Sequence, residues 1–375
     1  MKDPEFPLDP DLIYLNHAGV APWSRAAAEA VKTLAEENMR RGAAGYPVWT
    51  SVESELRNRL ARFIGVSDSA DIALVKNTSE GLSLVALGLD WQPGDNVVIN
   101  DQEFPSNRMV WEAAAERFGL ELRDVRLDAA ASPEDALIQA MDERTRVLPV
   151  SSVQYASGLR MDLERLGQAC RDLGTLFCVD AIQSLGALPF DAPAVGADFV
   201  IADGHKWMLA PEGLGLFYSR PEARERLALT QYGWHMAEAM GDYDRKDWTP
   251  ARSARRFEPG SPNTLAVHAL NASLALLEAR GMSRIGESVL GNASHLLSRI
   301  AEIPQFEAIT PAEPGRHAGI VTFRVAGADA RALNTRLRRA GVVAAQRGGG
   351  LRFSPHFYTP QEDLDTALER VLELV

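Results

Sequence analysis

Apolar positions along the first two-thirds of the chain follow two different spacings. In some segments they recur every three or four residues, as on one face of an α-helix, and in others they form short β-branched runs, as in buried strands. The first spacing predicts helices at 25–38, 52–64, 79–88, 108–118 and 163–173. The second predicts strands at 72–75, 96–100, 121–125, 146–153, 176–179, 199–202 and 215–218. This alternation predicts an α/β fold with a mostly parallel sheet and helices on both faces.

The pattern changes after residue 220. A long polar and aromatic stretch, 231–263, has no clear periodicity, and irregular segments of this kind are usually functional or form an interface. Beyond it the spacing predicts helices at 265–279, 286–303, 330–340 and 361–374, with strands at 319–325 and 351–354. We therefore expect a large domain over 16–263 and a smaller C-terminal α+β domain over 264–375. Segment 1–15 is expected to pack against the small domain.

Composition and charge exclude several classes of partner. The 375 residues include 39 Lys and Arg against 51 Asp and Glu, which gives a net charge of −12 with no basic stripe to offset it. Nucleic acid and anionic membrane are therefore not expected as partners. Cys170 and Cys178 are too few for a disulfide framework and have no partners at zinc-ligand spacing, so no metal site is expected. The first residues lack the features of a signal peptide, which predicts a cytoplasmic protein.

Two of the predicted strands end in residues that carry chemistry. Ligands of open parallel sheets bind beyond the carboxyl ends of the strands. Asp180 follows one strand, with Gln183 close behind, although a single Asp at such a point is more often a helix cap. The next strand leads into His205 and Lys206, and apolar residues follow. Burial among those residues would lower the pKa of the Lys206 amine and make it nucleophilic, as Schiff-base chemistry requires.

A third strand end, at residue 75, leads into Asn77, Thr78 and Ser79 at the start of a helix. Hydroxyl groups and free backbone amides at a helix N-terminus form an anion site, although a simple capping role accounts equally well for these residues.

Pyridoxal phosphate needs a lysine for its aldehyde, a carboxylate for its ring nitrogen and a cradle for its phosphate. Lys206, Asp180 and Thr78 with Ser79 supply these groups. Phe104, at another strand end, could stack on the ring or simply pack.

Eight segments in order resemble the class V aminotransferases and cysteine-desulfurase-like enzymes of fold type I, which depend on pyridoxal phosphate. These segments are YLNHAG (14–19), NTSEG (77–81), QEFPSN (102–107), VSSVQYASG (150–158), VDAIQSLGA (179–187), ADGHKWMLAPEG (202–213), RFEPGSPN (256–263) and LRFSPHFYTPQEDLD (351–365). They span nearly the whole chain. The resemblance implies the fold type I architecture and a homodimer.

The resemblance also implies roles for individual residues. Lys206 corresponds to the lysine of the cofactor aldimine and Asp180 to the partner of the ring nitrogen. Gln183 corresponds to the hydrogen-bond partner of the ring hydroxyl, and Phe104 takes the place of a histidine that stacks on the ring in the desulfurases. Thr78, Ser79 and His205 correspond to phosphate ligands, Ser261 to a residue that reaches the phosphate of the other subunit, and Arg352 to the arginine that binds the substrate carboxylate through a bidentate fork.

Several positions depart from the family pattern or carry weaker signals. No cysteine lies between Gly341 and Phe353, where a desulfurase has its persulfide cysteine, so ordinary cysteine desulfuration is not expected. Asp203 takes the place of a small hydroxyl residue and is expected to point away from the phosphate or to bind it through water. Tyr155 takes the place of an asparagine. His17 is a candidate for substrate contact, and a simple hydrogen-bonding role is the alternative.

The sequence therefore predicts an enzyme that acts on an amino acid through a Lys206 aldimine, with a class V aminotransferase as the first hypothesis. A keto acid is a further expected substrate. The alternative is a C–S lyase, or a selenocysteine-lyase-like or kynureninase-like enzyme that breaks a bond of the amino acid. A regulator that has kept the fold without catalysis is disfavoured, because the acidic chain has no spare segment for a DNA-binding appendage.

Overall fold

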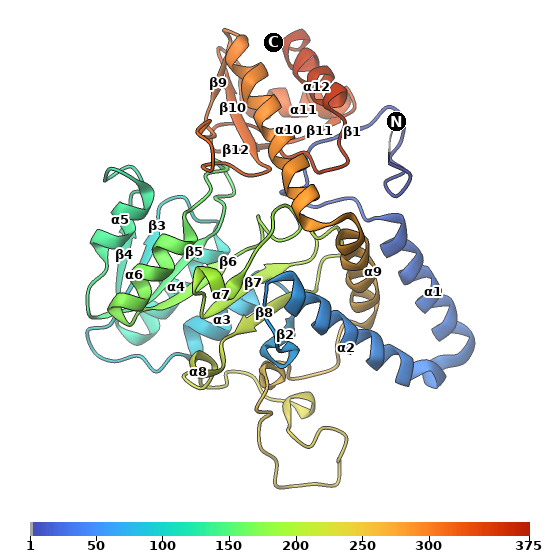
Figure 1. The fold of residues 1–375 in the computed structure, drawn as a ribbon, viewed down its shortest axis with the longest axis vertical. Helices are drawn as coiled ribbons and strands as arrows, with labels where there is room; N and C mark the ends of the chain where they lie inside the picture. Colours follow the sequence, from blue (N-terminus) through green and yellow to red (C-terminus); the bar gives the residue numbers. More distant parts are fainter. Residues whose placement is uncertain (1–2) are drawn as a thin grey trace.

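A seven-stranded sheet forms the centre of the larger domain (Figure 1). The computed structural model describes residues 3–375. The strand order is β2-β8-β7-β6-β5-β3-β4; β8 is antiparallel to β2 and β7, and the other neighbours are parallel. The strands are β2 (Ile72–Val75), β3 (Asn96–Asn100), β4 (Glu121–Val125), β5 (Thr145–Ser151), β6 (Leu176–Asp180), β7 (Phe199–Asp203) and β8 (Gly215–Ser219). The predicted α/β fold with a mostly parallel sheet is confirmed.

Helices cover both faces of this sheet. Side chains of a strand alternate between the faces, so Val97 and Ile99 belong to one hydrophobic core and Val98 to the other. The first core includes residues of α3 (Thr78–Gly88) and α4 (Ser106–Phe118). The second includes residues of α2 (Tyr46–Phe63), α5 (Pro133–Ala140), α6 (Leu163–Leu173) and α9 (Thr264–Arg280). Because strands buried on both faces are apolar throughout, they stand out in the sequence as continuous apolar runs.

All five helices predicted for this domain between residues 25 and 173 are present, and the main difference is the start of α2. Helix α1 (Arg25–Arg41) begins after Ser24, whose hydroxyl accepts a hydrogen bond from the Ala27 amide. Helix α2 begins six residues before the predicted start of 52, at Tyr46. Helix α5 and the short helices α7 (Ala192–Val195) and α8 (Pro221–Arg224) were not predicted. They are only four to eight residues long, so a helical period could hardly show in their sequences.

The smaller domain is built on a four-stranded antiparallel sheet of order β12-β13-β10-β9. Its strands are β9 (Phe306–Ala308), β10 (Val321–Val325), β12 (Ala345–Arg347) and β13 (Gly350–Phe353), and its helices are α10 (Met282–Glu302), α11 (Ala330–Arg339) and α12 (Gln361–Glu373). The N-terminal strand β1 (Ile13–Tyr14) pairs in parallel with β11 (Val342–Val343). This pairing places Ile13 and Tyr14 on the small domain (Figure 1), whereas Phe6, earlier in the segment, belongs to the core of the large domain.

The two domains do not divide at residue 264. Helix α9 packs against α1 and α2, and its Leu270 and Leu274 belong to the core of the large domain. Val289 of α10 belongs to that core as well, whereas Leu296, two turns later, belongs to the core of the small domain. The division between the cores therefore lies within α10, a long helix whose two halves pack in different domains.

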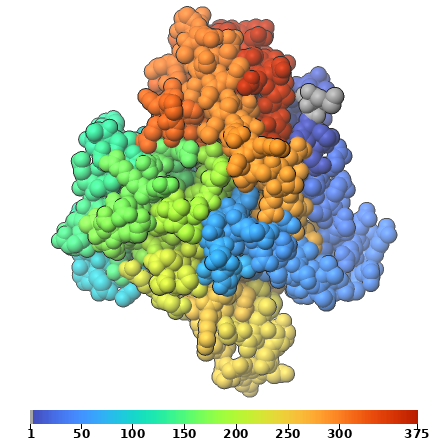
Figure 2. Space-filling model, in the orientation of Figure 1, coloured from blue at the N-terminus to red at the C-terminus, as the bar shows by residue number. Residues whose placement is uncertain are grey.

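The irregular stretch after residue 230 projects from the large domain as a lobe, which is yellow at the bottom of Figures 1 and 2. It contains the short 3-10 turns η3 (Trp234–Met236) and η4 (Ala254–Phe257), and its Tyr232 and Tyr243 are exposed. Within residues 3–375, no helix combines the length and apolar character that crossing a membrane requires.

Candidate functional site

A cavity of about 300 Å³ lies where β6 and β7 end, with Asp180 and Asp203 as the last residues of the two strands. Seven parts of the chain meet around it: the N-terminal segment, the starts of α3 and α4, the loop after β5, the turns after β6 and β7, and the β12–β13 hairpin. The lining residues are Ala18, Gly19, Val20, Asn77, Thr78, Ser79, Phe104, Ser106, Tyr155, Asp180, Ile182, Gln183, Asp203, His205, Lys206, Arg347 and Arg352. Most of the residues predicted from the sequence are thus brought together.

Lys206 lies on a tight turn directly after β7. The amide of Leu209 donates to the carbonyl oxygen of Lys206 (3.0 Å), and Leu209 has a φ of 60°, the one positive value at a non-glycine residue in the described part of the chain. Such a backbone conformation is costly and persists only where the surroundings enforce it. The side chain of Lys206 is buried, and its amine makes no hydrogen bond or ion pair within residues 3–375. Burial lowers its pKa, so the nucleophilic neutral amine is favoured.

Asp180 faces the same cavity from the end of β6. Its carboxylate accepts a hydrogen bond from the Ile182 amide (3.0 Å) and is almost fully buried. Burial raises its pKa, and the nearby Lys206 opposes that rise. A buried carboxylate without an ion-pair partner in the protein is suited to bind a cationic group of a ligand. The ion pair compensates for the solvation that the carboxylate lost on burial.

The N-terminus of α3 supplies the predicted anion site. Asn77 caps the helix by accepting from the Glu80 amide (2.9 Å), and within residues 3–375 the amides of Thr78 and Ser79 have no hydrogen-bond partner. The Thr78 hydroxyl is buried without a hydrogen-bond partner, and the Ser79 hydroxyl donates to Ser106 (2.8 Å). These groups can therefore receive an anion such as a phosphate.

Close packing of α3 against the sheet depends on Gly81. A Cβ at this position would lie 2.7 Å from Cγ2 of Ile201 on β7, which is shorter than a normal contact. The absence of a side chain lets the first turn of α3 come close to the strand whose end carries Lys206. The NTSEG segment thus needs its glycine for the approach of helix and sheet.

His205 and Asp203 form a pair beside Lys206. Nδ1 of His205 lies 3.0 Å from Oδ1 of Asp203, but the two atoms are not aligned for a hydrogen bond, so the contact is electrostatic. Asp203 was expected to point away from a phosphate or to reach it through water. Its side chain lines the cavity and lies against the imidazole that the resemblance assigns to the phosphate, and the expectation stays a prediction.

Arg352 is a buried cation without a carboxylate partner. Its side chain is 2% exposed; Nη1 donates to the carbonyl oxygen of Tyr155 (2.8 Å), and Nη2 donates to Oδ1 of Asn16 (3.4 Å). Nε is buried and has no hydrogen-bond partner. Burial and the neighbouring Arg347 lower its pKa, yet a guanidinium stays charged in proteins. Since an unpaired buried charge is costly, this group is suited to a carboxylate ligand.

Gln183 and Phe104 complete the cavity wall. Oε1 of Gln183 accepts from the indole nitrogen of Trp207 (2.9 Å), and Nε2 donates to the carbonyl oxygen of Ala18 (3.1 Å), which leaves one amide hydrogen free. The Phe104 ring is 38% exposed, and its centroid lies 5.5 Å from Nζ of Lys206. Its face is therefore available to a ring bound at Lys206.

His17 and Ser261 lie outside this cavity. The His17 ring is fully buried: Nδ1 bonds with the carbonyl oxygen of Ser354 (2.8 Å) and Nε2 with the hydroxyl of Tyr358 (2.6 Å). Both nitrogens are therefore occupied, and the expected substrate contact gives way to the alternative, a structural hydrogen-bonding role. Ser261 is exposed on its loop, and its predicted role needs a second subunit.

Sequence reasoning missed some of the lining residues. Ser106 lies in the QEFPSN segment, at the start of a helix that follows a strand. This position in the sequence was the signal that could have identified it. Arg347 stands next to three consecutive glycines, a pattern that predicts a turn between strands and does not indicate that the arginine lines a cavity. The segment from Ala18 to Val20 carries no distinctive side chains, so only the tertiary structure shows that it lines the cavity.

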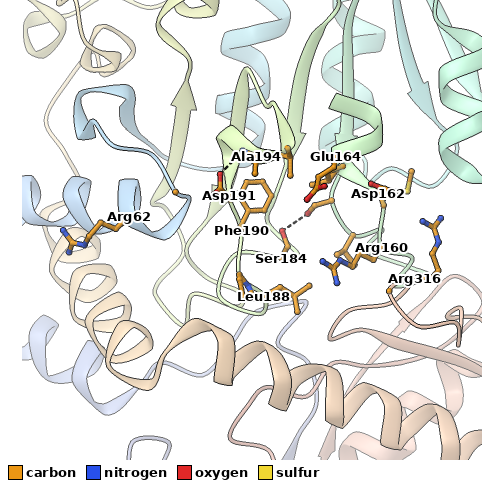
Figure 3. Close-up of a pocket in the computed structure, with 18 residues that line it drawn as sticks. Arg62, Arg160, Asp162, Glu164, Ser184, Leu188, Phe190, Asp191, Ala194 and Arg316 are labelled. Carbon is orange, nitrogen blue, oxygen red and sulfur yellow. Dashed lines mark hydrogen bonds between the residues drawn. The ribbon is translucent and has the colours of Figure 1, made fainter. Parts of the chain in front are cut away.

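A second, larger cavity of about 730 Å³ shares no lining residue with the first (Figure 3). Its lining includes arginines such as Arg160 and Arg316 and acidic residues such as Asp162 and Glu164, but no lysine, histidine or cysteine. Arg316 is already paired with Glu134 (3.0 Å). Among its described lining residues no amine is present that could condense with an aldehyde, as Lys206 could in the smaller cavity.

Three potential metal ligands, Glu53, His235 and Glu258, lie together near η3 and η4. Arg57 donates to Glu53 (2.6 Å) and to both oxygens of Glu258 (2.5 and 2.7 Å). The guanidinium of Arg57 thus already neutralises both carboxylates, which leaves them poorly suited to bind a metal ion.

The smaller cavity fits pyridoxal phosphate on the basis of its own unpaired groups. Within residues 3–375, an amine without a hydrogen bond or ion pair at Lys206, an orphaned hydroxyl at Thr78 and a buried carboxylate at Asp180 match the aldehyde, the phosphate and the ring nitrogen of that cofactor.

Comparisons with known proteins agree with this geometry. A family model described as aminotransferase class V matches residues 13–366. The chain is 32% identical to an isopenicillin N epimerase of Streptomyces clavuligerus, over 96% of this chain and 94% of the relative. It is 28% identical to a probable cysteine desulfurase of Methanothermobacter thermautotrophicus, over 99% of this chain and 96% of the relative.

Solved structures confirm the fold type I architecture. The cystine C–S lyase C-DES in complex with cysteine persulfide has a TM-score of 0.91 at 24% identity, with 98% of each chain covered. The apo cysteine desulfurase of Thermococcus onnurineus has a TM-score of 0.88 at 26% identity, covering all of this chain and 98% of the other. At such low identity the first of these supports the fold and no particular activity.

Proposed function

Because the chain belongs to the class V aminotransferase family, whose members use pyridoxal phosphate, we propose that it is an aminotransferase that acts on the α-amino group of an amino acid. The observation that carries this proposal is the meeting of an unpaired buried lysine, a buried aspartate and an unpaired buried arginine in one cavity. The three groups correspond to the cofactor aldehyde, the cofactor ring and the substrate carboxylate.

Different residues of the cavity would serve cofactor binding and proton transfer. Pyridoxal phosphate, when bound, supplies an aldehyde that condenses with amines and a ring that takes up electrons from the substrate Cα. Lys206 would hold the aldehyde, and the N-terminus of α3 with Thr78, Ser79 and His205 would hold the phosphate. Asp180 would keep the ring nitrogen protonated. The Lys206 amine, when free, would accept the proton from the substrate Cα.

Arg352 orients the substrate. A bidentate guanidinium fixes the plane of a carboxylate, and with it the direction of the Cα–H bond. Because the Tyr155 carbonyl oxygen and Asn16 already hold the arginine in place, its geometry is set before the substrate arrives. Such preorganisation lowers the entropic cost of positioning the substrate.

The cysteines of this chain argue against desulfuration, although several relatives are named cysteine desulfurases. Cys170 lies in α6 and Cys178 in β6, both buried and neither on the cavity wall. Burial raises the pKa of both thiols, and a persulfide needs a reactive thiolate. We therefore place amino transfer ahead of sulfur transfer.

Bond cleavage remains the second candidate, as a C–S lyase or as a selenocysteine-lyase-like or kynureninase-like enzyme. These reactions share with transamination the binding of an amino acid at Arg352 and Lys206. The relative named an isopenicillin N epimerase adds inversion at Cα as a reaction that the same lysine could serve.

Product analysis tests the proposal. The purified protein is incubated with a panel of amino acids that includes the sulfur and selenium analogues, and absorbance and products are followed together. A keto acid, with the cofactor converted to pyridoxamine phosphate, supports transamination; pyruvate with ammonia, or sulfide, selenide or alanine as products, supports cleavage; and a D-amino acid supports epimerisation.

The assignment of Lys206 has its own test. Borohydride should trap the cofactor on Lys206 in the unaltered protein, and Lys206→Ala should abolish that adduct in the mass spectrum. A protein that takes up no added cofactor would overturn the whole proposal.

We further propose a homodimer in which Ser261 reaches the neighbouring active site, in a cytoplasmic protein. The exposure of Ser261 and of the aromatic residues in the projecting lobe supports this arrangement. Sedimentation of the intact protein and of Ser261→Ala tests the dimer. Both proteins should be dimers, whereas the cofactor affinity of Ser261→Ala should be lower than that of the intact protein.

A further inference from the structure

The β12–β13 hairpin brings a second arginine into the cavity beside Arg352. Ala345 on β12 lies directly opposite Arg352 on β13 in the antiparallel register. Because side chains two residues apart on a strand share a face, Arg347 lies on the same face as Ala345 and Arg352. Arg347 and Arg352 are therefore diagonal cross-strand neighbours, a relationship that puts residues about 7–8 Å apart.

The turn of the hairpin fixes this arrangement. Gly348 and Gly349 connect the two strands with φ values of 54° and 78°, and positive φ at both central residues is what a tight type I′ turn requires. The turn packs beside the loop after β5, since a Cβ on Gly348 would lie 3.5 Å from Cβ of Ala156. The same loop holds Arg352 through the Tyr155 carbonyl oxygen. The hairpin is thus anchored at the edge of the cavity.

Neither arginine is neutralised by the protein. Within residues 3–375, no ion pair joins Arg347 or Arg352 to an acidic side chain, whereas the buried or half-buried Arg57, Arg224 and Arg316 each have one. Arg347 is exposed, and its one hydrogen bond goes to the carbonyl oxygen of the adjacent Gln346 (2.7 Å). Its positive charge nevertheless acts on the cavity, because it helps to lower the pKa of both Lys206 and Arg352.

A substrate with a single carboxylate would neutralise Arg352 and leave Arg347 unpaired. The cofactor phosphate does not fill this need, since its place is at the N-terminus of α3. We infer that the cavity is built for a dicarboxylic amino acid, whose α-carboxylate binds Arg352 and whose side-chain carboxylate binds Arg347. This inference rests on the proposed function and specifies the substrate class of that site. Arg347 is then the residue that determines specificity.

Binding of unreactive acids tests the inference without any catalytic readout. Succinate and glutarate carry two carboxylates and no amine, and butyrate carries one. Calorimetric titration of the cofactor-loaded protein should show that at least one of the two dicarboxylates binds about tenfold or more tightly than butyrate. Arg347→Gln should remove this preference and change butyrate binding by less than about twofold. Arg347→Lys, which keeps the charge and loses the bidentate fork, should keep part of the preference for dicarboxylates.

Arg339→Gln is the matched control, since Arg339 is exposed at the end of α11 and its substitution removes the same charge from a residue that does not line the cavity. It should leave all three affinities unchanged. Equal affinity for dicarboxylates and butyrate in the unaltered protein would overturn the inference. So would an Arg347→Gln protein that keeps the preference, or one whose main defect is a weaker dimer, which would show that Arg347 pairs with a second copy of the chain.

These outcomes are distinct from failure of the proposed function. If borohydride traps the cofactor on Lys206 but the dicarboxylate preference is absent, the substrate class alone is wrong. If the protein takes up no cofactor, both the function and the inference fall.

Discussion

Arg352 of the small domain donates a hydrogen bond from Nη1 to the carbonyl oxygen of Tyr155 in the large domain, 2.8 Å away. The bond aims the guanidinium at the cavity and uses a neutral acceptor, so the positive charge remains available. It also ties the position of the substrate carboxylate to the packing of one domain on the other. A movement of the small domain would therefore move Arg352 relative to Lys206.

Arg352→Lys should weaken amino-acid binding at least about 30-fold, because lysine cannot reproduce the bidentate fork and loss of a buried charge pair costs about 2–5 kcal/mol. The absorbance of the bound cofactor reports the binding in a titration. The spectrum without substrate should not change, because Arg352 does not hold the cofactor. Unchanged affinity, or loss of the cofactor itself, would show that the carboxylate binds elsewhere, with Arg347 as the next candidate.

The pKa of Lys206 should lie well below the ordinary lysine value of 10.5, because burial disfavours the ammonium form. Reductive methylation of the cofactor-free protein across a pH series, followed by peptide mass spectrometry, gives the titration midpoint. Asp180→Asn should lower the midpoint further, since the Asp180 charge raises this pKa. A midpoint at the ordinary value would mean that water reaches the amine.

The same shift predicts how stability depends on pH. Between the lowered pKa of Lys206 and 10.5, the unfolded chain binds more protons at this residue than the folded chain does. The contribution of Lys206 to the free energy of unfolding therefore rises with pH across that window. Denaturant unfolding of the cofactor-free protein and of Lys206→Met at several pH values isolates this contribution, and the variant should lack the rise.

Gly81→Ala should destabilise the protein by about 1–3 kcal/mol, because the new Cβ would crowd Ile201 in a filled core. Thermal unfolding measures the loss, and cofactor affinity should fall with it as the first turn of α3 shifts. Gly291→Ala is the control: this residue is exposed in α10 with nothing within 4 Å of the added carbon. The control should stabilise by about 0.5–1 kcal/mol, as alanine does in a helix. Equal effects would contradict the packing argument.

Cys170 and Cys178 should not react with a thiol reagent in the native protein, since both are buried and burial raises the pKa of both thiols. Denaturant should make both reactive. Ser288→Cys adds an exposed thiol on α10 and should react at once under native conditions. Fast native labelling of either natural cysteine would reopen sulfur transfer as the reaction.

The sequence by itself determined the sheet and the centre of the chemistry. Apolar strand runs and amphipathic helices are local patterns, and the carboxyl ends of parallel strands necessarily share one edge, so the order of strands and polar residues already places Asp180 and Lys206 together. The positions of the two cysteines in the chain likewise predicted that neither serves as a persulfide cysteine. Each of these conclusions needs only neighbours in sequence and one rule of topology.

The tertiary structure alone decided the features that depend on distant segments. His17 is enclosed by Ser354 and Tyr358, which lie more than three hundred residues away, so its burial has no local signal. The division between the domains falls within α10 because one helix packs in two cores. Arg347 shares a face with Arg352 only through the register of a hairpin, and a shift of one residue would turn it away. Long-range packing and strand register, which leave no periodic trace in the sequence, fix these relationships.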